Sequence, residues 1–260
     1  MTSTTTPIML NSGAAMPPIG FGCWQVGRAA IAEAARAGYR AFDTATFYGN
    51  EKQVGQAIGD AGLARADVFV TTKVWRNDMG YAGTLKAYDT SRRLLGVESV
   101  DLYLIHWPQP DDKLVTETWR AMEHLLDRGE VKSIGVSNFE ESDLDLLARH
   151  SDVVPAVNQI ELHPLRQRKR LVAANTARGI VTTAWSPLGQ GGPVLRNPEL
   201  KSVAAAHGVS VAQVVLRWML QKQIVTIPRS GNAERIAQNI DLDGFELSPA
   251  EVARIDALAN

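Results

Sequence analysis

The chain has 260 residues, of which 45% are hydrophobic, so it can bury a sizeable core in one large domain or two small ones. Its 27 basic and 28 acidic side chains leave a formal net charge of −1 at pH 7. This balance gives no electrostatic reason to expect nucleic acid or a membrane surface as a partner.

Eight short segments rich in β-branched and aromatic residues are expected to form strands. In chain order they are residues 19–24, 39–44, 68–74, 100–107, 131–139, 156–162, 179–186 and 224–230. Longer segments repeat apolar residues at i, i+3 and i+4, which predicts amphipathic helices. These are residues 29–38, 51–62, 83–96, 115–129, 141–150, 168–179, 209–222 and, after a Ser-Pro cap, 248–260.

The repeated strand-then-helix order predicts a closed (β/α)8 TIM barrel, an α/β fold that forms a single domain over residues 1–260. A doubly wound open sheet is the competing fold, but it would show Gly-x-Gly-x-x-Gly after its first strand. The segment GFGCWQVG does not have that spacing. Residues 7–20 are expected to form an N-terminal β-hairpin that turns at Ser12-Gly13 and plugs the bottom of the barrel.

Four titratable side chains lie where predicted strands end: Asp43, Tyr48, Lys73 and His106. In a (β/α)8 barrel the carboxyl ends of the strands form the rim that carries catalysis. Taken singly, Asp43 fits a helix cap, Tyr48 a packing residue and His106 a core histidine. Lys73 is hardest to explain by packing, because an amine that ends an apolar strand needs a partner or loses its proton. Asp43, on the adjacent strand, is the natural partner.

Seven segments resemble signature sequences of the aldo-keto reductases, and they are closest to the bacterial 2,5-diketo-D-gluconate reductase-like branch. The segments are FDTATFYGNE, TTKVW, LIHWP, GVSNF, NQIELHP, AWSPLGQG and IPRS with the Arg and Asn that follow it. The match runs from about residue 8 to the end of the chain. The resemblance implies NADPH-dependent reduction of small aldehydes or ketones to alcohols by hydride transfer.

The four rim residues then receive roles that ordinary acid–base chemistry supports. A phenol has a pKa near 10, and an ammonium beside Tyr48 is expected to lower it. Lys73 would supply that charge, and Asp43 would keep Lys73 protonated. A neutral His106 would orient the substrate carbonyl and, with Tyr48, form a hole for the developing oxyanion. Tyr48 would act as the general acid.

No side chain can give a hydride, so a nicotinamide cofactor is expected. Trp185 offers a flat face to a nicotinamide ring, although a core tryptophan fits the sequence equally well. The loop that contains Ser186, Leu188, Gln190 and Gly191 can turn backbone N–H groups toward a pyrophosphate. Gly-rich loops alone are weak signals, so this loop gains its meaning from its place after the seventh strand.

Two further groups of polar residues complete the expected cofactor site. Ser137, Asn138 and Gln159 end the fifth and sixth strands, and the resemblance implies that they hold the nicotinamide carboxamide. An anion site for the 2′-phosphate of NADPH is expected where basic groups lie beside a helix N-terminus after the eighth strand. Its residues are Arg229, Ser230, Arg235 and Asn239. A solvated basic helix face is the alternative explanation for this last group.

The substrate end of the site is expected to be aromatic. Trp24, Trp75 and Trp107 lie at strand ends, and the resemblance places them along the substrate channel. Many relatives continue beyond the last helix into a tail over the pocket, so a chain that stops at Asn260 is expected to have a more open site. No metal is expected, because the sequence has neither a His-x-His on an early strand nor a cysteine cluster.

Two other functions stay open at this point. A Schiff-base lyase or aldolase would use Lys73 as nucleophile if its pKa were depressed, although Asp43 argues against that. A non-catalytic NADPH-binding regulatory subunit is the second. The single cysteine, Cys23, and the absence of a signal sequence or a long apolar run favour a cytoplasmic protein. The resemblance implies a monomer.

Overall fold

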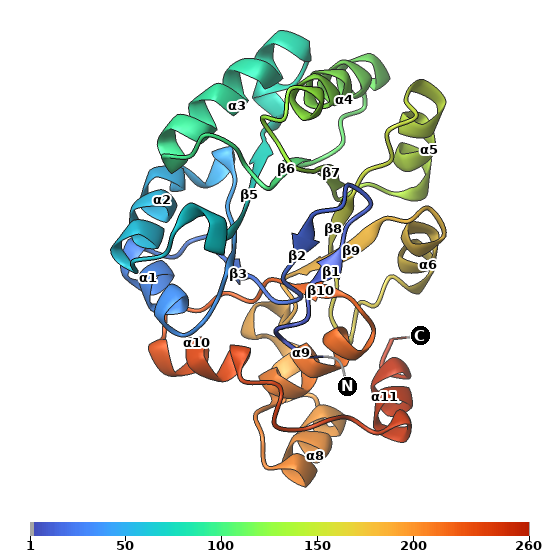
Figure 1. The fold of residues 1–260 in the computed structure, drawn as a ribbon. Helices are drawn as coiled ribbons and strands as arrows, with labels where there is room; N and C mark the ends of the chain where they lie inside the picture. Colours follow the sequence, from blue (N-terminus) through green and yellow to red (C-terminus); the bar gives the residue numbers. More distant parts are fainter. Residues whose placement is uncertain (1–2, 260) are drawn as a thin grey trace.

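Eight parallel strands form one sheet in the computed structural model, which describes residues 3–259 (Figure 1). They are β3 (Phe21–Gly22), β4 (Ala41–Asp43), β5 (Phe69–Val74), β6 (Leu102–Ile105), β7 (Ile134–Ser137), β8 (Val157–Glu161), β9 (Val181–Trp185) and β10 (Val225–Thr226). Each strand pairs in parallel with the next one in the chain. All eight lie within the segments predicted from sequence.

The first and last strands of this sheet also meet. A parallel bridge joins Ile19 to Thr226, and the N–H of Gly20 donates to the carbonyl of Thr226 at 2.8 Å. The sheet is therefore closed on itself. This confirms the (β/α)8 barrel, and it brings the carboxyl ends of all eight strands to one rim.

Helices surround the strands (Figure 1). They are α1 (Arg28–Arg36), α2 (Glu51–Asp60), α3 (Tyr81–Leu95), α4 (Asp112–Asp127), α5 (Glu141–His150), α6 (Lys169–Ala177), α7 (Pro193–Arg196), α8 (Pro198–His207), α9 (Val211–Gln221), α10 (Ala233–Ile240) and α11 (Pro249–Asp256). Neither α7 nor α8 is predicted by the apolar spacing of the sequence. The Asn197 side chain caps α8 by accepting from the N–H groups of Glu199 and Leu200, a local signal that periodicity alone does not detect.

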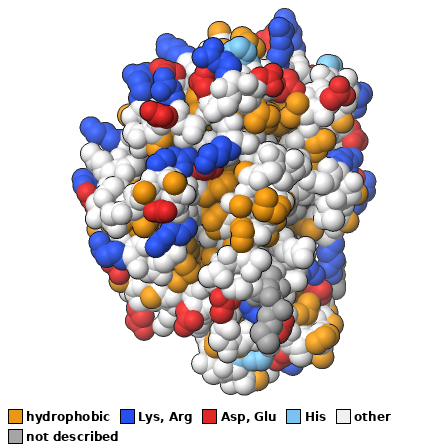
Figure 2. Space-filling model, in the orientation of Figure 1, with side chains coloured by type: hydrophobic (Ala, Val, Ile, Leu, Met, Phe, Trp, Pro, Cys, Tyr) orange, Lys and Arg blue, Asp and Glu red, His pale blue; other side chains and the backbone are white. Residues whose placement is uncertain are grey.

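The N-terminal hairpin closes the amino end of the barrel, as expected. Strands β1 (Ile8–Met9) and β2 (Ala15–Met16) pair antiparallel, with Ile8 opposite Met16. Leu10 and Met16 are buried in a cluster with residues from inside the barrel: Ala41, Phe69, Leu102, Leu104, Ala156, Val157 and Val225. Hydrophobic side chains gather near the centre of the face that carries the hairpin (Figure 2).

Tight contacts between outer elements fix the barrel wall. Gly55 of α2 lies so close to α3 that a Cβ at this position would sit 2.0 Å from the carbonyl oxygen of Leu95. Trp119 and Trp218, on α4 and α9, are each 1% exposed and lie in the core. Within residues 3–259 no single helix is long and apolar enough to cross a membrane; α8 and α9 together pass on length and composition but are bent by 89°.

Candidate active site

The four predicted catalytic residues come from three neighbouring strands and the turn after the first of them. Asp43 is the last residue of β4, Lys73 lies in β5, and His106 directly follows β6. Tyr48 ends the short 3-10 helix η1 (Thr46–Tyr48), which follows β4. Parallel pairing sets Asp43 beside Thr71 and Lys73 beside Leu104, so the side chains converge at the rim.

A buried ion pair forms the base of this site. The Lys73 ammonium donates to Asp43 Oδ1 at 2.5 Å and to the carbonyl of Thr44 at 2.9 Å, and the Lys73 side chain is fully buried. The other carboxylate oxygen of Asp43 accepts from Gln159 Nε2 at 2.7 Å. Burial acts to lower the pKa of Lys73, but the charges and hydrogen bonds of Asp43 and Tyr48 outweigh it, so the pKa is raised and the amine stays charged.

Tyr48 lies over this pair, but its net acidity differs from the expectation. The Lys73 nitrogen lies 5.1 Å from the centroid of the Tyr48 ring. Burial raises the pKa of Tyr48; the Lys73 charge and its hydrogen bond lower it, while the Asp43 charge raises it again. The net direction is upward, because the ion pair is nearly neutral as a unit and cannot offset the loss of water around the phenol. Tyr48 is therefore a neutral phenol.

His106 is a neutral imidazole. Burial, followed by the charges of Lys73 and Arg76, lowers its pKa to about 2. Within the described chain its Nδ1 is buried and has no hydrogen-bond partner. A buried lone pair without a partner is less costly than a buried N–H without one, which favours the tautomer that carries the proton on Nε2. That tautomer can donate to a carbonyl oxygen.

A chain of hydrogen bonds connects the next three strand ends. Ser137 Oγ donates to the carbonyl of Gln159 at 2.9 Å, and Asn138 Nδ2 donates to Ser137 Oγ at 2.9 Å and to the carbonyl of His106 at 3.1 Å. Asn138 Oδ1 accepts from Trp185 Nε1 at 2.8 Å. These contacts hold Trp185 at the mouth of β9. The side-chain amide nitrogen of Asn138 and one lone pair of its Oδ1 are thus engaged, whereas the side-chain Oε1 of Gln159 accepts no hydrogen bond among residues 3–259.

The loop after β9 has the backbone shape expected of an anion cradle. Ser186 and Gln190 have φ values of 48° and 54°, and the flanking Gly189 and Gly191 have φ values of 56° and 77°. Left-handed residues of this kind can turn neighbouring N–H groups to one side, and the N–H groups of Gly189 and Gly191 donate within the loop to the carbonyls of Ser186 and Leu188. Leu188 begins the 3-10 helix η4 (Gly189–Gly191) as its N-cap.

The predicted basic group lies at the end of the barrel beside α10. Arg235 is exposed on the first turn of α10, Asn239 is buried one turn later, and Asn232 caps the helix by accepting from the N–H of Arg235 at 3.0 Å. Arg229 is exposed and donates to the carbonyl of Trp24 at 3.4 Å. Ser230 donates to the carbonyl of Asn232 at 3.4 Å. Both guanidinium groups are thus free of carboxylate partners within residues 3–259.

One cavity of about 680 Å³ brings these groups together. Its lining contains every predicted site residue except Lys73, which lies behind Asp43 and Tyr48. The lining residues that were predicted are Trp24, Asp43, Tyr48, Trp75, His106, Trp107, Ser137, Asn138, Gln159, Trp185, Ser186, Leu188, Gln190, Gly191, Arg229, Ser230, Arg235 and Asn239. The lining holds aromatic side chains, the predicted catalytic groups and two arginines, Arg229 and Arg235. The cavity therefore combines an apolar wall, a reactive centre and cationic groups.

Phe47 is the main lining residue that the sequence analysis missed. It is 49% exposed, and it stacks on Trp75 with ring centroids 4.0 Å apart and on Trp24 at 5.5 Å. Its aromatic type and its place directly before Tyr48 were the available signals. An exposed phenylalanine at a strand-end rim is unusual for a packing residue.

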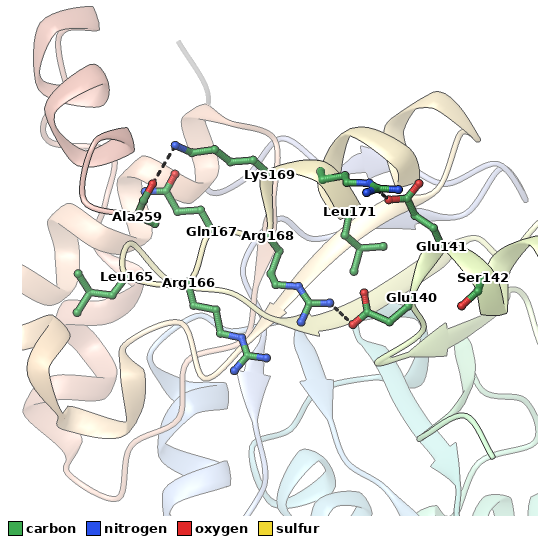
Figure 3. Close-up of a pocket in the computed structure, with 11 residues that line it drawn as sticks. Glu140, Glu141, Ser142, Leu165, Arg166, Gln167, Arg168, Lys169, Leu171 and Ala259 are labelled. Carbon is green, nitrogen blue, oxygen red and sulfur yellow. Dashed lines mark hydrogen bonds and ion pairs between the residues drawn. The ribbon is translucent and has the colours of Figure 1, made fainter. Parts of the chain in front are cut away.

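A second hollow of about 910 Å³ lies on the outside of the barrel, between α5, α6 and the end of the chain (Figure 3). Figure 3 shows that its charged groups contact one another: Arg168 reaches Glu140, and Lys169 reaches the carbonyl of Ala259. Arg170 pairs with Glu141 at 2.6 Å. These charges are satisfied internally, and none of the four predicted catalytic residues lines this hollow, so the smaller cavity at the rim is the candidate active site.

The family model described as "Aldo/keto reductase family" matches residues 18–260 of this chain. Morphine 6-dehydrogenase of Pseudomonas putida is 48% identical over an alignment of 267 positions, which covers 96% of this chain and 90% of that protein. Glyoxal reductase of Bacillus subtilis is 43% identical over an alignment of 262 positions, which covers 99% of this chain and 94% of that protein.

A solved structure, that of a Gox0644 mutant in complex with NADPH, has the same fold. It superimposes with a TM-score of 0.93 at 41% identity, and the match covers 98% of this chain and 94% of that chain. The 2,5-diketo-D-gluconate reductase-like branch stays a prediction. The family match over most of the chain and the relatives of this identity show that the protein belongs to the aldo/keto reductase family of oxidoreductases.

Proposed function

We propose that this protein reduces aldehydes or ketones to alcohols with NADPH as hydride donor. The observation that carries the proposal is the buried Lys73–Asp43 pair beneath a neutral phenol and a neutral imidazole. Both neutral groups can donate a hydrogen bond to one carbonyl oxygen, and the ammonium below them stabilises negative charge on the phenol oxygen.

The residues act in a simple order. His106 Nε2–H and the Tyr48 hydroxyl orient the carbonyl oxygen and polarise the carbon. Tyr48 would transfer its proton to the carbonyl oxygen as negative charge develops there during reduction. An alkoxide is a stronger base than a phenolate, so the raised pKa of Tyr48 does not block this transfer. Lys73 then stabilises the phenolate, and Asp43 and Gln159 keep Lys73 charged and in place.

Features of the cavity support nicotinamide adenine dinucleotide phosphate as the cofactor. When bound, NADPH supplies the hydride. Trp185 gives a flat apolar face near the reactive centre, and residues of the Ser186–Gly191 loop line the cavity with the left-handed turns typical of a backbone anion site. Arg229 and Arg235 have no carboxylate partner in residues 3–259 and suit a 2′-phosphate, which favours NADPH over NADH.

The Schiff-base alternative is disfavoured by the state of Lys73. A nucleophilic lysine must lose its proton, whereas the pKa of Lys73 is raised and its nitrogen is engaged by Asp43 and the carbonyl of Thr44. The non-catalytic subunit is distinguished by activity alone: it would bind NADPH tightly and reduce no carbonyl in a broad panel.

The decisive experiment measures NADPH-linked turnover over a carbonyl panel, with NADH beside it. The names of the relatives suggest α-dicarbonyls such as glyoxal and bulky cyclic ketones as first members. Tyr48→Phe is expected to lower kcat by about 10²- to 10⁴-fold while NADPH affinity, measured by fluorescence titration, stays near that of the wild type. Full turnover in this variant would exclude Tyr48 as the acid.

We further propose that residues 1–260 form one domain that acts as a monomer in the cytoplasm. The continuous barrel and its single buried cysteine support this. Light scattering coupled to size-exclusion chromatography tests the monomer, and a dimer mass would refute it.

A further inference from the structure

Three stacked aromatic rings line one side of the active-site cavity, and a cation just outside the lining extends the stack. Trp24 stacks on Phe47 with planes 16° apart, and Phe47 stacks on Trp75 with planes 20° apart. The guanidinium carbon of Arg76 lies 4.8 Å from the Trp75 ring centroid. Two groups this close to one indole need its opposite faces, so Trp75 lies between Phe47 and Arg76.

The charge of Arg76 is not neutralised by the protein. Its guanidinium is exposed, and among residues 3–259 it has neither a carboxylate nor a hydrogen-bond partner, only the indole face. Asp78, the acid in the same 3-10 helix η3 (Arg76–Asp78), forms no ion pair with Arg76 in this part of the chain. The electrostatic influence of Asp78 falls on Tyr103 instead, where burial and then the charges of Glu51 and Asp78 raise the pKa. Stacking holds a guanidinium by its face and leaves its in-plane N–H donors available.

Arg76 is also within electrostatic reach of the reacting atoms. His106 packs edge-on against Trp75 with ring centroids 5.0 Å apart, so the imidazole and the guanidinium contact the same indole. The charge of Arg76 adds to burial and to Lys73 in lowering the pKa of His106. The imidazole centroid and the guanidinium carbon each lie about 5 Å from that indole's centroid, so they are at most about 10 Å apart. A para-substituted benzaldehyde whose far end extends past the cavity lining can span this distance.

We propose that Arg76 is a specificity-determining residue that selects carbonyl compounds with a carboxylate on the side of the molecule opposite the carbonyl. This inference rests on the proposed reductase activity and adds its substrate class. The planar cation donates paired hydrogen bonds to the carboxylate, while the Phe47–Trp75 wall takes the apolar body of the substrate. Arg229 and Arg235 are the arginines that line the cavity itself, and the proposed function assigns them to the cofactor.

A matched substrate pair tests this role. 4-Carboxybenzaldehyde and methyl 4-formylbenzoate share the reacting carbonyl and differ in the charge of the far group. NADPH-linked kcat/KM is measured for both with the wild type, Arg76→Gln, Arg76→Lys and the charge control Lys201→Gln, which removes an exposed cation from α8. The acid-to-ester ratio of kcat/KM cancels effects on the stack or on the imidazole.

The ratio is expected to fall about tenfold in Arg76→Gln, because one charge-assisted contact is lost from the acid alone. Arg76→Lys keeps the charge without the planar fork, so its acid-to-ester ratio is expected to lie between those of the wild type and Arg76→Gln. Lys201→Gln is expected to keep the wild-type ratio. The same ratio in Arg76→Gln and the wild type, or an equal fall in Lys201→Gln, overturns the proposal.

Tryptophan fluorescence titration of both compounds with NADP⁺ present separates this proposal from the reductase activity. Tighter binding of the acid that depends on Arg76, without turnover of either compound, supports anion selection and refutes the reductase. Turnover of the ester with no preference for the acid in either assay supports the reductase and refutes the role of Arg76.

Discussion

Replacement of Lys73 by methionine tests the structural and the chemical parts of the site at once. The change leaves the Asp43 carboxylate buried, with the Gln159 amide as its remaining side-chain partner. Loss of one member of a buried ion pair costs about 3–5 kcal/mol of folding free energy. In a protein of this size that corresponds to a fall in Tm of roughly 10 °C.

The double variant Asp43→Asn with Lys73→Met gives the sharper result. It removes both charges, so most of the lost stability is expected to return. Activity is not expected to return, because no cation remains under Tyr48; kcat should stay about 10²- to 10⁴-fold below that of the wild type in both variants. Thermal unfolding by circular dichroism gives Tm, and NADPH-linked turnover gives kcat.

Controls define what would refute this reasoning. Lys113 and Glu117 form an exposed pair 3.8 Å apart on α4, so Lys113→Met is expected to cost less than about 1 kcal/mol. Since the pKa of Lys73 is raised in the fold, its charge contributes fully to the free energy of unfolding below the ordinary lysine pKa of about 10.4. That stabilisation is lost as the pH rises through the pKa that Lys73 has in the folded protein. A wild-type Tm in Lys73→Met, or additive losses in the double variant, would contradict the buried charged pair.

Three further predictions test separate parts of the structure. The pKa of His106 is about 2 in the fold and about 6.5 in the unfolded chain, so between these pH values the unfolded state binds one more proton at this side chain. Lowering the pH from 7 to 5 should therefore reduce the free energy of unfolding in urea by about 2 kcal/mol more in the wild type than in His106→Gln. Equal losses in the two proteins would refute this. Gly55→Ala should destabilise the fold by about 1–3 kcal/mol or more, because the new Cβ would meet the Leu95 carbonyl. Its control, Gly59→Ala, has no atom within 4 Å of the new Cβ and should be neutral or stabilising by up to about 1 kcal/mol. Similar melting curves for the two variants would contradict the close packing of α2 on α3. Arg235→Ala should raise the Kd for NADPH about tenfold and leave the Kd for NADH near its wild-type value, and an equal change for both would exclude a role with the 2′-phosphate.

The sequence predicted most of the fold because its main signals are local. Strand segments are marked by composition, and helices by their apolar spacing, whatever their surroundings. The order of these elements then leaves few topologies, because parallel neighbours require crossovers of one hand. The short β10 shows the limit: the predicted segment runs to residue 230, but Pro228 has no N–H to donate, and the strand ends at Thr226.

The site was predicted less completely, because its properties depend on contacts between distant segments. The strand-end positions of Lys73 and Asp43 indicated their pairing, and the structure shows it. The net acidity of Tyr48 was not accessible, since it is the balance of burial against two opposite charges. The stacking of Phe47 and Arg76 on Trp75 also has no sequence signal, because it depends on how the turns after β4 and β5 meet.

The amino-acid sequence by itself determined the barrel, the order of its strands and the identity of the rim residues, because each follows from the pattern along the chain. Only the tertiary structure decided which rim groups are charged, which are neutral and which cations are left without partners. Those properties depend on distances and on the exclusion of water, and neither exists until strands far apart in the sequence come together.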